Sequence, residues 1–195
     1  KTYNSGTHAL SDVNIQINKG EFVFVVGSSG AGKSTFMKLI MREEKANTGI
    51  ITVNGFNLTK MSRKKVPMLR RTMGIVFQDF RLIPSMNVYD NVAYAMRVIG
   101  SRESAIRKRV PYLLGLVGLN SKARSKPNQL SGGEQQRVAL ARALANNASM
   151  IIAGIIRLPS PVPTIVSIAF PPKNKIDVRL TNINKASQNT ANIVL

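Results

Sequence analysis

The sequence predicts an α/β fold, in which buried strands alternate with amphipathic helices. Residues 22–26 form an uninterrupted apolar run of strand length, as in a strand buried on both faces. A glycine-rich turn follows, and then a helical pattern from Lys33 to about Arg42. Hydrophobic residues make up 44% of the 195 residues, which is enough for a packed core.

The remaining elements of the first half are expected from periodicity and turn residues. Val13, Ile15 and Ile17 alternate with polar residues, which is typical of a half-buried strand over 10–18. Asn18-Lys19-Gly20 is a turn, and Asn54-Gly55 closes another strand. In order, we expect strands at 10–18, 21–26, 49–53 and 73–77, with helices at 33–42 and 60–71.

Helical spacing dominates the second half as far as residue 145. Apolar residues recur at helical intervals over 87–99, over 106–117 and over 130–145. Pro111 and Gly115 interrupt the second of these. Residues 150–153 begin one more strand. The composition changes after residue 153. Apolar residues no longer recur at helical intervals there, and prolines occur at positions 159, 161, 163, 171 and 172.

Composition excludes several classes of protein and favours a polyanionic neighbour. The absence of Cys excludes a disulfide framework and a thiolate metal site, and a single His, His8, excludes a histidine cluster. No apolar run is long enough to span a membrane by itself. Lys and Arg total 28 against 9 acids, a net charge of +19. Nucleic acid, anionic lipid or nucleotide phosphate would each match that charge. The start lacks Met, and we expect it to lie inside a longer reading frame.

The glycine-rich turn has the pattern of a phosphate-binding loop. Residues 27–34 fit G-x-x-x-x-G-K-[ST], between a strand and a helix as that motif requires. Its backbone N–H groups and the helix N-terminus would hold phosphate, Lys33 would add a charge, and Ser34 could ligate Mg²⁺. The alternative is a strand–helix turn without a ligand. The candidate binding residues are Gly27, Ser28, Ser29, Gly30, Ala31, Gly32, Lys33, Ser34 and Thr35.

A second motif, Leu-Ser-Gly-Gly-Glu-Gln-Gln-Arg, occupies residues 130–137. Ser131 and Glu134 have the spacing of a capping box at a helix N-terminus. Gly132 and Gly133 would let a ligand or another chain approach the first turn closely. A well-capped structural helix is the alternative interpretation.

Together these motifs resemble ABC-transporter ATPases, whose signature motif residues 130–137 match. Gln78, in Val-Phe-Gln-Asp at 76–79, resembles the glutamine of that family's Q-loop, and Tyr3 resembles the aromatic residue that stacks on adenine. The resemblance covers residues 1–153 and implies a P-loop NTPase fold with a helical signature-motif subdomain. The N-terminal strand would be partly missing.

The resemblance also implies how ATP is held. Two such domains would form a head-to-tail homodimer, with ATP between the P-loop of one copy and the signature motif of the other. Ser131, Gly132 and Gly133 would then contact the γ-phosphate next to Lys33 of the other copy. Gln78 would ligate Mg²⁺ together with Ser34 and would respond to the γ-phosphate. Lys33 and Gln78 are therefore the expected catalytic residues.

Three further segments narrow the resemblance to the bacterial cell-division ATP-binding proteins of the FtsE type. They are residues 2–10, 77–82 and 87–92. Such proteins act at the cytoplasmic face of the cell membrane with an integral partner, FtsX, and control cell-wall hydrolases at the septum. Lipoprotein-release and macrolide-export ATPases are the close alternatives. Phe80, Leu82, Ile83 and Met86 would lie where the family docks its membrane partner, unless they are ordinary core residues.

The sequence departs from the family after Ala153. The family's Walker B strand ends in Asp-Glu, whereas Met-Ile-Ile-Ala at 150–153 is followed by Gly154 and Ile155. Between Ala153 and Asp177 the sequence has no Asp or Glu, and the switch histidine is absent. We therefore expect nucleotide binding with very weak hydrolysis. A pseudoenzyme that binds nucleotide without hydrolysing it is an alternative. We hypothesise a frameshift that makes residues 154–195 a divergent, proline-rich tail, and an absence of an Asp-Glu continuation in the other reading frames would contradict it.

Two basic clusters leave a nucleic-acid binder as an alternative from another class. No nucleic-acid-binding motif accompanies them and aromatic residues are only 6%, so a solvated or membrane-facing surface is the favoured interpretation and no nucleic acid is expected. The clusters are Lys60, Arg63, Lys64, Lys65, Arg70 and Arg71, and Arg107, Lys108 and Arg109.

Overall fold

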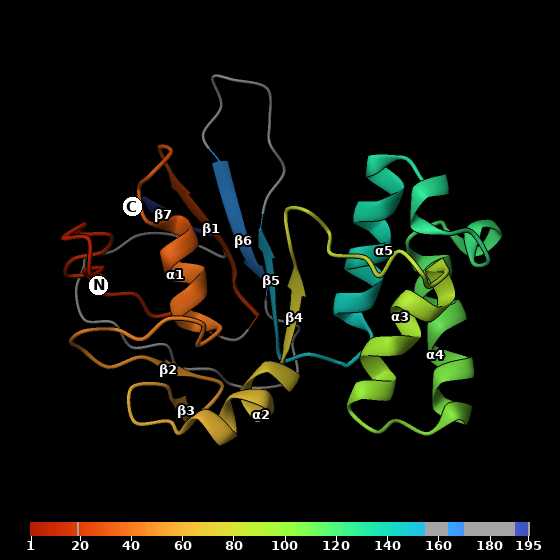
Figure 1. Ribbon diagram of the computed structural model, residues 1–195, viewed down its shortest axis with the longest axis horizontal. Coiled ribbons are helices and arrows are strands. Elements are labelled where there is room, and N and C mark those ends of the chain that lie inside the picture. The colour runs from red at the N-terminus through yellow and green to blue at the C-terminus, as the bar shows by residue number, and fades with distance from the viewer. Residues whose placement is uncertain (19, 155–163, 170–189, 195) are drawn as a thin grey trace. The chain divides into compact units, whose positions relative to one another are not determined.

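The computed structural model describes residues 1–18, 20–154, 164–169 and 190–194. The chain divides into two compact units, Lys1–Arg70 with Gly154–Leu195, and Arg71–Ala153. Each unit is described by itself. Helices and strands alternate along the chain, which confirms the predicted α/β class (Figure 1).

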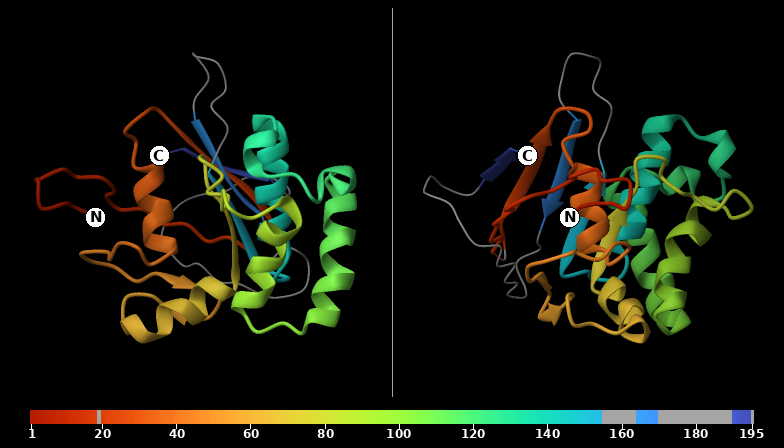
Figure 2. Two further views of the ribbon diagram at one scale, coloured as in Figure 1. Left: turned by 45° about the vertical axis from the view of Figure 1, so that its right-hand side comes forward. Right: turned by 60° about the vertical axis from the view of Figure 1, so that its left-hand side comes forward.

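The first unit is organised around strand β1, Phe22–Gly27. On one side β1 pairs antiparallel with β6, Thr164–Ala169, and on the other it pairs in parallel with β7, Thr190–Val194. These three strands lie side by side in Figure 2. The predicted central strand is confirmed, but Phe22 is 40% exposed and burial alternates along the strand, so only one face of β1 is fully buried.

Helix α1, Lys33–Ile40, follows the glycine-rich turn as predicted. Phe36, Leu39 and Ile40 are buried, which anchors the helix along one face. Strands β2 (Thr52–Val53) and β3 (Phe56–Asn57) form a small hairpin through the predicted Asn54-Gly55 turn. The basic stretch forms a 3-10 turn η1, Arg63–Lys65, and helix α2, Val66–Arg71.

The strand predicted at residues 10–18 is wrong. The described structure has no strand there, although Ile17 is buried and Val13 and Ile15 are half-buried. Alternation reports which side chains face a core, whereas a strand also requires a neighbour for its backbone hydrogen bonds. Within the described residues this segment has no such ladder, and only an isolated bridge joins Thr2 to His8 nearby.

The second unit combines a two-stranded parallel ladder with three packed helices. Strand β4, Met73–Val76, pairs with β5, Met150–Gly154. The helices are α3 (Val88–Val98), α4 (Glu103–Leu116) and α5 (Gly132–Leu144), with 3-10 turns η2 (Asn120–Lys122) and η3 (Pro127–Gln129) before α5. The three helices lie together in Figure 1.

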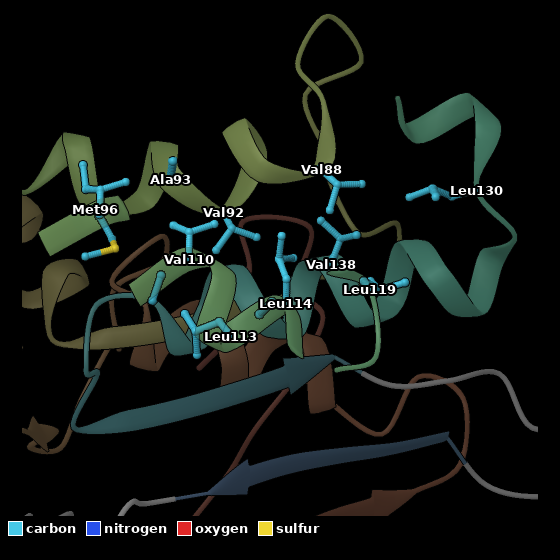
Figure 3. Packing of buried hydrophobic residues seen from close by; sticks show 13 residues of the cluster. Val88, Val92, Ala93, Met96, Val110, Leu113, Leu114, Leu119, Leu130 and Val138 are labelled. Atoms are coloured by element: carbon cyan, nitrogen blue, oxygen red, sulfur yellow. The ribbon is translucent and has the colours of Figure 1, made fainter. Parts of the chain in front are cut away.

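These helices share one apolar core, shown in Figure 3. Val92, Val110 and Val138, one from each helix, are all completely buried. On the other side of α5, Gly74 of β4 lies so close that an added Cβ would be 2.4 Å from the Ala143 carbonyl oxygen. Glycine is therefore required at position 74 for this strand and helix to pack. None of the helices in the described residues has the length and apolar character that crossing a bilayer requires.

Candidate functional site

The glycine-rich loop between β1 and α1 has the geometry of an anion-binding loop. Gly30 and Gly32 have φ of 85° and 88°, in the left-handed region that glycine adopts without strain. Gly32 is the N-cap of α1, and none of the side chains that the structure describes caps that helix end. The first N–H groups of α1 therefore lack a side-chain acceptor, as expected where a phosphate would bind.

Lys33 is only 7% exposed, and its ammonium group is held by the loop itself. Nζ donates to the carbonyl oxygen of Gly27 at 2.7 Å and also to that of Ser28. A buried cation that is satisfied only by neutral carbonyls would gain from a nearby anion. Ser34 is exposed at the start of α1, so its hydroxyl is accessible to a metal–nucleotide complex.

Tyr3 lies against the same helix. Its hydroxyl is 3.2 Å from Oγ1 of Thr35, a buried residue of the loop-to-helix junction. The ammonium of Lys1 lies 4.9 Å from the centre of the Tyr3 ring, and Lys1 is also paired with Glu44 at 3.0 Å. One face of the ring is thus covered by a cation, and a base that stacks on Tyr3 would use the other face or displace Lys1.

A cavity of about 430 Å³ in the first unit lies elsewhere. It is lined by residues of the N-terminal segment, the apolar face of α1 and residues 46–51, among them Leu10, Phe36 and Ile51. None of residues 27–34 lines it. Phosphate binding in such loops uses backbone N–H groups at a surface rather than an enclosed cavity, so we place the candidate site at the loop.

In the second unit, the predicted capping box at the start of α5 is confirmed. The Glu134 N–H donates to Oγ of Ser131 at 3.3 Å, and the Ser131 N–H donates to the Glu134 carboxylate at 2.8 Å. Hydrogen bonds from the backbone and then the side chain of Ser131 hold the pKa of Glu134 below its ordinary value. The capping box therefore holds the first turn of α5 through contacts within that turn.

Gly132 and Gly133 lie in this first turn, where an added side chain would have space. A Cβ added to Gly132 would meet nothing within 4 Å, and one added to Gly133 would meet only the Arg137 guanidinium at 3.8 Å. Packing within the described chain therefore does not explain either glycine, in contrast to Gly74. An external partner at this helix N-terminus would explain both.

Gln78 follows β4 on an exposed loop. Beyond it, Phe80 packs against the buried cluster of Val76, Ala139 and Ala143, and Leu82 packs against that cluster and the three-helix core. Core packing is thus confirmed for these two apolar residues. Ile83 and Met86 are half-buried as well.

Strand β5 carries the Walker B-like sequence but ends without an acid. Ala153 pairs with Val76 of β4, so the strand itself forms. The next residue is Gly154. Among the described residues no cluster of three His, Cys, Asp or Glu side chains could hold a metal ion. The end of β5 therefore offers Mg²⁺ no carboxylate.

Some side chains of the two basic clusters form hydrogen bonds within the chain, and the others are exposed to solvent. Arg109 donates to the Leu144 carbonyl and to Asn147, and Arg70 donates to the Met41 carbonyl, so both have structural roles. Exposed cations remain in both clusters: Lys60, Arg63, Lys64, Lys65, Arg71, Arg107 and Lys108.

Comparison with known proteins agrees with this geometry. The family model described as ABC transporter matches residues 10–153, which span the phosphate loop, the Q-loop and the capped α5. The chain belongs to the ABC transporter family. A dimeric ATP-binding cassette solved in a post-hydrolysis state with ADP and Pi is 39% identical, with a TM-score of 0.71 over 78% of this chain and 69% of that one. This likeness confirms the predicted P-loop ATPase fold.

Relatives within the family include the cell division ATP-binding protein FtsE. Identity is 54% over 153 residues with the protein of Streptococcus pneumoniae serotype 2 (strain D39 / NCTC 7466). That alignment covers 78% of this chain and 66% of the relative, so the chain spans slightly less than two thirds of its length. The Mycobacterium tuberculosis FtsE is 51% identical over 154 residues, covering 78% of this chain and 67% of that protein. The methionine import protein MetN of Helicobacter pylori is 44% identical over 152 residues, covering 78% and 46%.

Sequence reasoning missed two side chains that shape the Q-loop. Arg142 of α5 and Asn91 of α3 both hydrogen-bond to its backbone. No local pattern marks either residue, because Arg142 is 61 positions from one of its acceptors. Asn91 had one signal, since it is a polar residue at a core-facing position of an apolar helix.

Proposed function

We propose that the chain is the ATP-binding subunit of an FtsE-type complex at the cytoplasmic face of a bacterial membrane. The observation that carries this proposal is the loop of residues 27–34, which ends on an uncapped helix N-terminus beside the buried Lys33 ammonium. Identity of 51–54% with FtsE proteins supports the cell-division role over methionine import, whose relatives are 43–44% identical.

Nucleotide binding would draw on groups already positioned in the first unit. The loop N–H groups and the start of α1 would hold the phosphates, and Tyr3 would contact the base. Lys33 would exchange its Gly27 and Ser28 carbonyl acceptors for phosphate oxygens, which are stronger acceptors. Mg²⁺ would supply charge neutralisation of the β- and γ-phosphates, with Ser34 and Gln78 as its protein ligands.

The open turn at Gly132 and Gly133 supports a homodimer of ATPase domains. ATP bound to one copy would meet the Ser131–Gly133 turn of the second copy, whose free N–H groups and helix dipole favour an anion. The related cassette described as dimeric, with ADP and Pi bound, supports the formation of a dimer. Density-gradient or light-scattering measurement should show ATP-dependent dimers that disappear in Lys33→Ala.

Hydrolysis should be very weak because β5 ends without the acids that would bind Mg²⁺ and polarise water. Binding of a fluorescent ATP analogue and phosphate release are to be measured on one preparation, with Lys33→Ala as the control. We expect binding that Lys33→Ala weakens, without turnover above that control. A turnover that Lys33→Ala abolishes would contradict this part of the proposal, and an absence of binding would contradict the whole.

The membrane partner would be an integral protein resembling FtsX, through which nucleotide state controls septal cell-wall hydrolases. ATP-binding subunits of lipoprotein-release or macrolide-export transporters remain the alternative. Co-purification with FtsX and with an exporter membrane subunit, from matched co-expression, should recover only the first complex. Salt-dependent sedimentation with anionic vesicles, beside DNA gel shifts, tests whether the exposed cations favour a membrane over nucleic acid.

We also propose that residues 1–153 form the family domain and that residues 154–195 are a divergent tail. The family model ends at residue 153, where the composition changes, which supports this boundary. Sequencing the coding DNA across codon 153 tests a frameshift. An Asp-Glu continuation in another frame is the expected result.

A further inference from the structure

Arg142 lies in α5 and hydrogen-bonds across the second unit to the loop that follows Gln78. Its Nη2 donates to the Phe80 carbonyl oxygen at 2.6 Å, and its Nη1 donates to that of Arg81 at 2.7 Å. Within the described residues no carboxylate lies at ion-pair distance from Arg142. The half-buried guanidinium group therefore depends on these two neighbouring carbonyls, which match its planar fork of donors.

The two carbonyls belong to a backbone conformation that needs support. Phe80 and Arg81 have φ of 56° and 43°, in the left-handed region that is unfavourable for residues with a Cβ. Consecutive non-glycine residues seldom adopt it unless surrounding contacts impose it. Arg142 supplies such contacts directly, because both of its hydrogen bonds end on the strained residues. The Phe80 side chain, packed on Ala139 and Ala143, adds a second attachment to α5.

The far end of the same loop is fastened by Asn91 of α3. This completely buried amide accepts from the Ile83 N–H at 2.8 Å and donates to the carbonyls of Ile83, Met86 and Asn87 at 3.0–3.1 Å. The residues between β4 and the clamped stretch are Phe77, Gln78 and Asp79, of which Gln78 and Asp79 are exposed. Gln78 is thus attached to a backbone that α5 holds within two residues of it.

We propose that Arg142 is a positioning residue that fixes the Q-loop backbone to the signature helix, so that the Gln78 segment and the Ser131–Gly133 turn move as one body. A helix is a stiff rod, and its capped N-terminus and Arg142 lie on the same helix. Any contact that displaces the N-terminus of α5 is then transmitted to the loop beside Gln78. The role of this movement rests on the proposed function, whereas the mechanical attachment does not.

Hydrogen exchange of the nucleotide-free full chain tests the attachment. The variants are Arg142→Ala, Arg142→Lys, which keeps the charge but not the two-pronged donor geometry, and the control Arg107→Lys, exposed on α4. We expect exchange in peptides covering residues 77–83 to accelerate at least about tenfold in Arg142→Ala and less in Arg142→Lys, with α3 and α4 unchanged and the control like wild type.

Unchanged loop exchange in Arg142→Ala would overturn the proposal. Equal acceleration throughout the second unit would also overturn it, because Arg142 would then only stabilise the fold. If Arg142→Ala does not fold, Arg142→Lys tests the proposal instead. Unchanged exchange of residues 77–83, or equal acceleration throughout the second unit, would then overturn it.

A second arm adds ATP and Mg²⁺ to wild type and to Arg142→Lys. Because Mg²⁺ bound by Gln78 would itself protect the start of the loop, the comparison uses residues 80–83, whose carbonyls Arg142 contacts. Protection should reach residues 132–134 in both proteins, and residues 80–83 should be protected more in wild type than in the variant. Equal protection of residues 80–83 in the two proteins would contradict transmission through Arg142. If ATP binds neither protein, the proposed function fails, while the nucleotide-free result still decides the attachment.

Discussion

Gly32 is the position at which one added methyl group should do most damage to the first unit. An alanine there would keep φ near 88°, which costs a residue with a Cβ about 1–2 kcal/mol. Its Cβ would also lie 2.3 Å from the Ala9 carbonyl oxygen and 2.8 Å from Cδ2 of Leu10, so backbone must shift. Overpacking of this kind adds about 1–3 kcal/mol. Gly32→Ala should therefore destabilise the fold by about 2–5 kcal/mol, the sum of these two principles.

Gly30→Ala is the matched control. Gly30 has nearly the same φ, 85°, but its added Cβ would meet nothing within 4 Å. Only the conformational cost applies, so this variant should lose about 1–2 kcal/mol. For a chain of this size each kcal/mol lowers the melting temperature by about 2–4 °C. Thermal unfolding followed by circular dichroism should therefore separate the two variants by several degrees.

Nucleotide binding provides a second measurement on the same pair. Gly32→Ala should also displace the N-terminus of α1 and weaken binding of a fluorescent ATP analogue more than Gly30→Ala does. Equal melting temperatures for the two variants would refute the reasoning, because the close approach of Ala9 would then have no energetic consequence.

The second unit yields three further predictions. Gly132→Ala should raise the melting temperature slightly, because alanine stabilises a helix by up to about 1 kcal/mol relative to glycine and the added Cβ would have open space. The same variant should no longer form ATP-dependent dimers. Normal dimerisation of the variant would show that Gly132 is not a contact site. Hydrogen bonds from Ser131 lower the folded-state pKa of Glu134 below its ordinary 4.5, so the ionised carboxylate stabilises the fold above that pH and loses this effect as the pH falls below it. The melting temperatures of wild type and Glu134→Gln should therefore differ at pH 7 and converge on acidification. A difference that stays constant with pH would contradict this. Asn87 caps α3 by accepting from the Asp90 N–H at 2.7 Å, so Asn87→Ala should cost about 1 kcal/mol in urea unfolding, and a loss near zero would exclude the cap.

The sequence correctly predicted those structural elements that are determined by residues only a few positions apart. The loop between β1 and α1 depends on glycine and on one helix start, and the start of α5 depends on Ser131 and Glu134, three positions apart. The sequence could not predict the Arg142–Phe80 contact, which spans 62 positions, because a guanidinium selects its acceptors only after the helices have packed.

Pro111 shows packing overriding a local signal. The sequence marks it as an interruption, but α4 runs through it from Glu103 to Leu116. A proline inside a helix costs about 3 kcal/mol or more. Ile106, Val110, Leu113 and Leu114 are all at most 1% exposed, and each such burial contributes about 1.5–3 kcal/mol. Burial on both sides of the proline therefore outweighs its cost, which inspection of the helical pattern alone could not establish.

Gly74, Gly32 and the glycine pair at 132–133 differ in what requires them, and this difference separates packing requirements from a proposed contact role. Gly74 is needed by the fold, since its Cβ would collide with the Ala143 carbonyl. Gly32 is needed by the fold and also leaves the first N–H groups of α1 without a side-chain cap. Gly132 and Gly133 have ordinary helical surroundings with open space, where glycine weakens a helix relative to alanine. Packing within the described chain does not account for these two glycines, whereas the proposed approach of ATP bound to a second copy would account for both. A variant that is more stable and less able to dimerise, as expected for Gly132→Ala, would be direct evidence for such an approach.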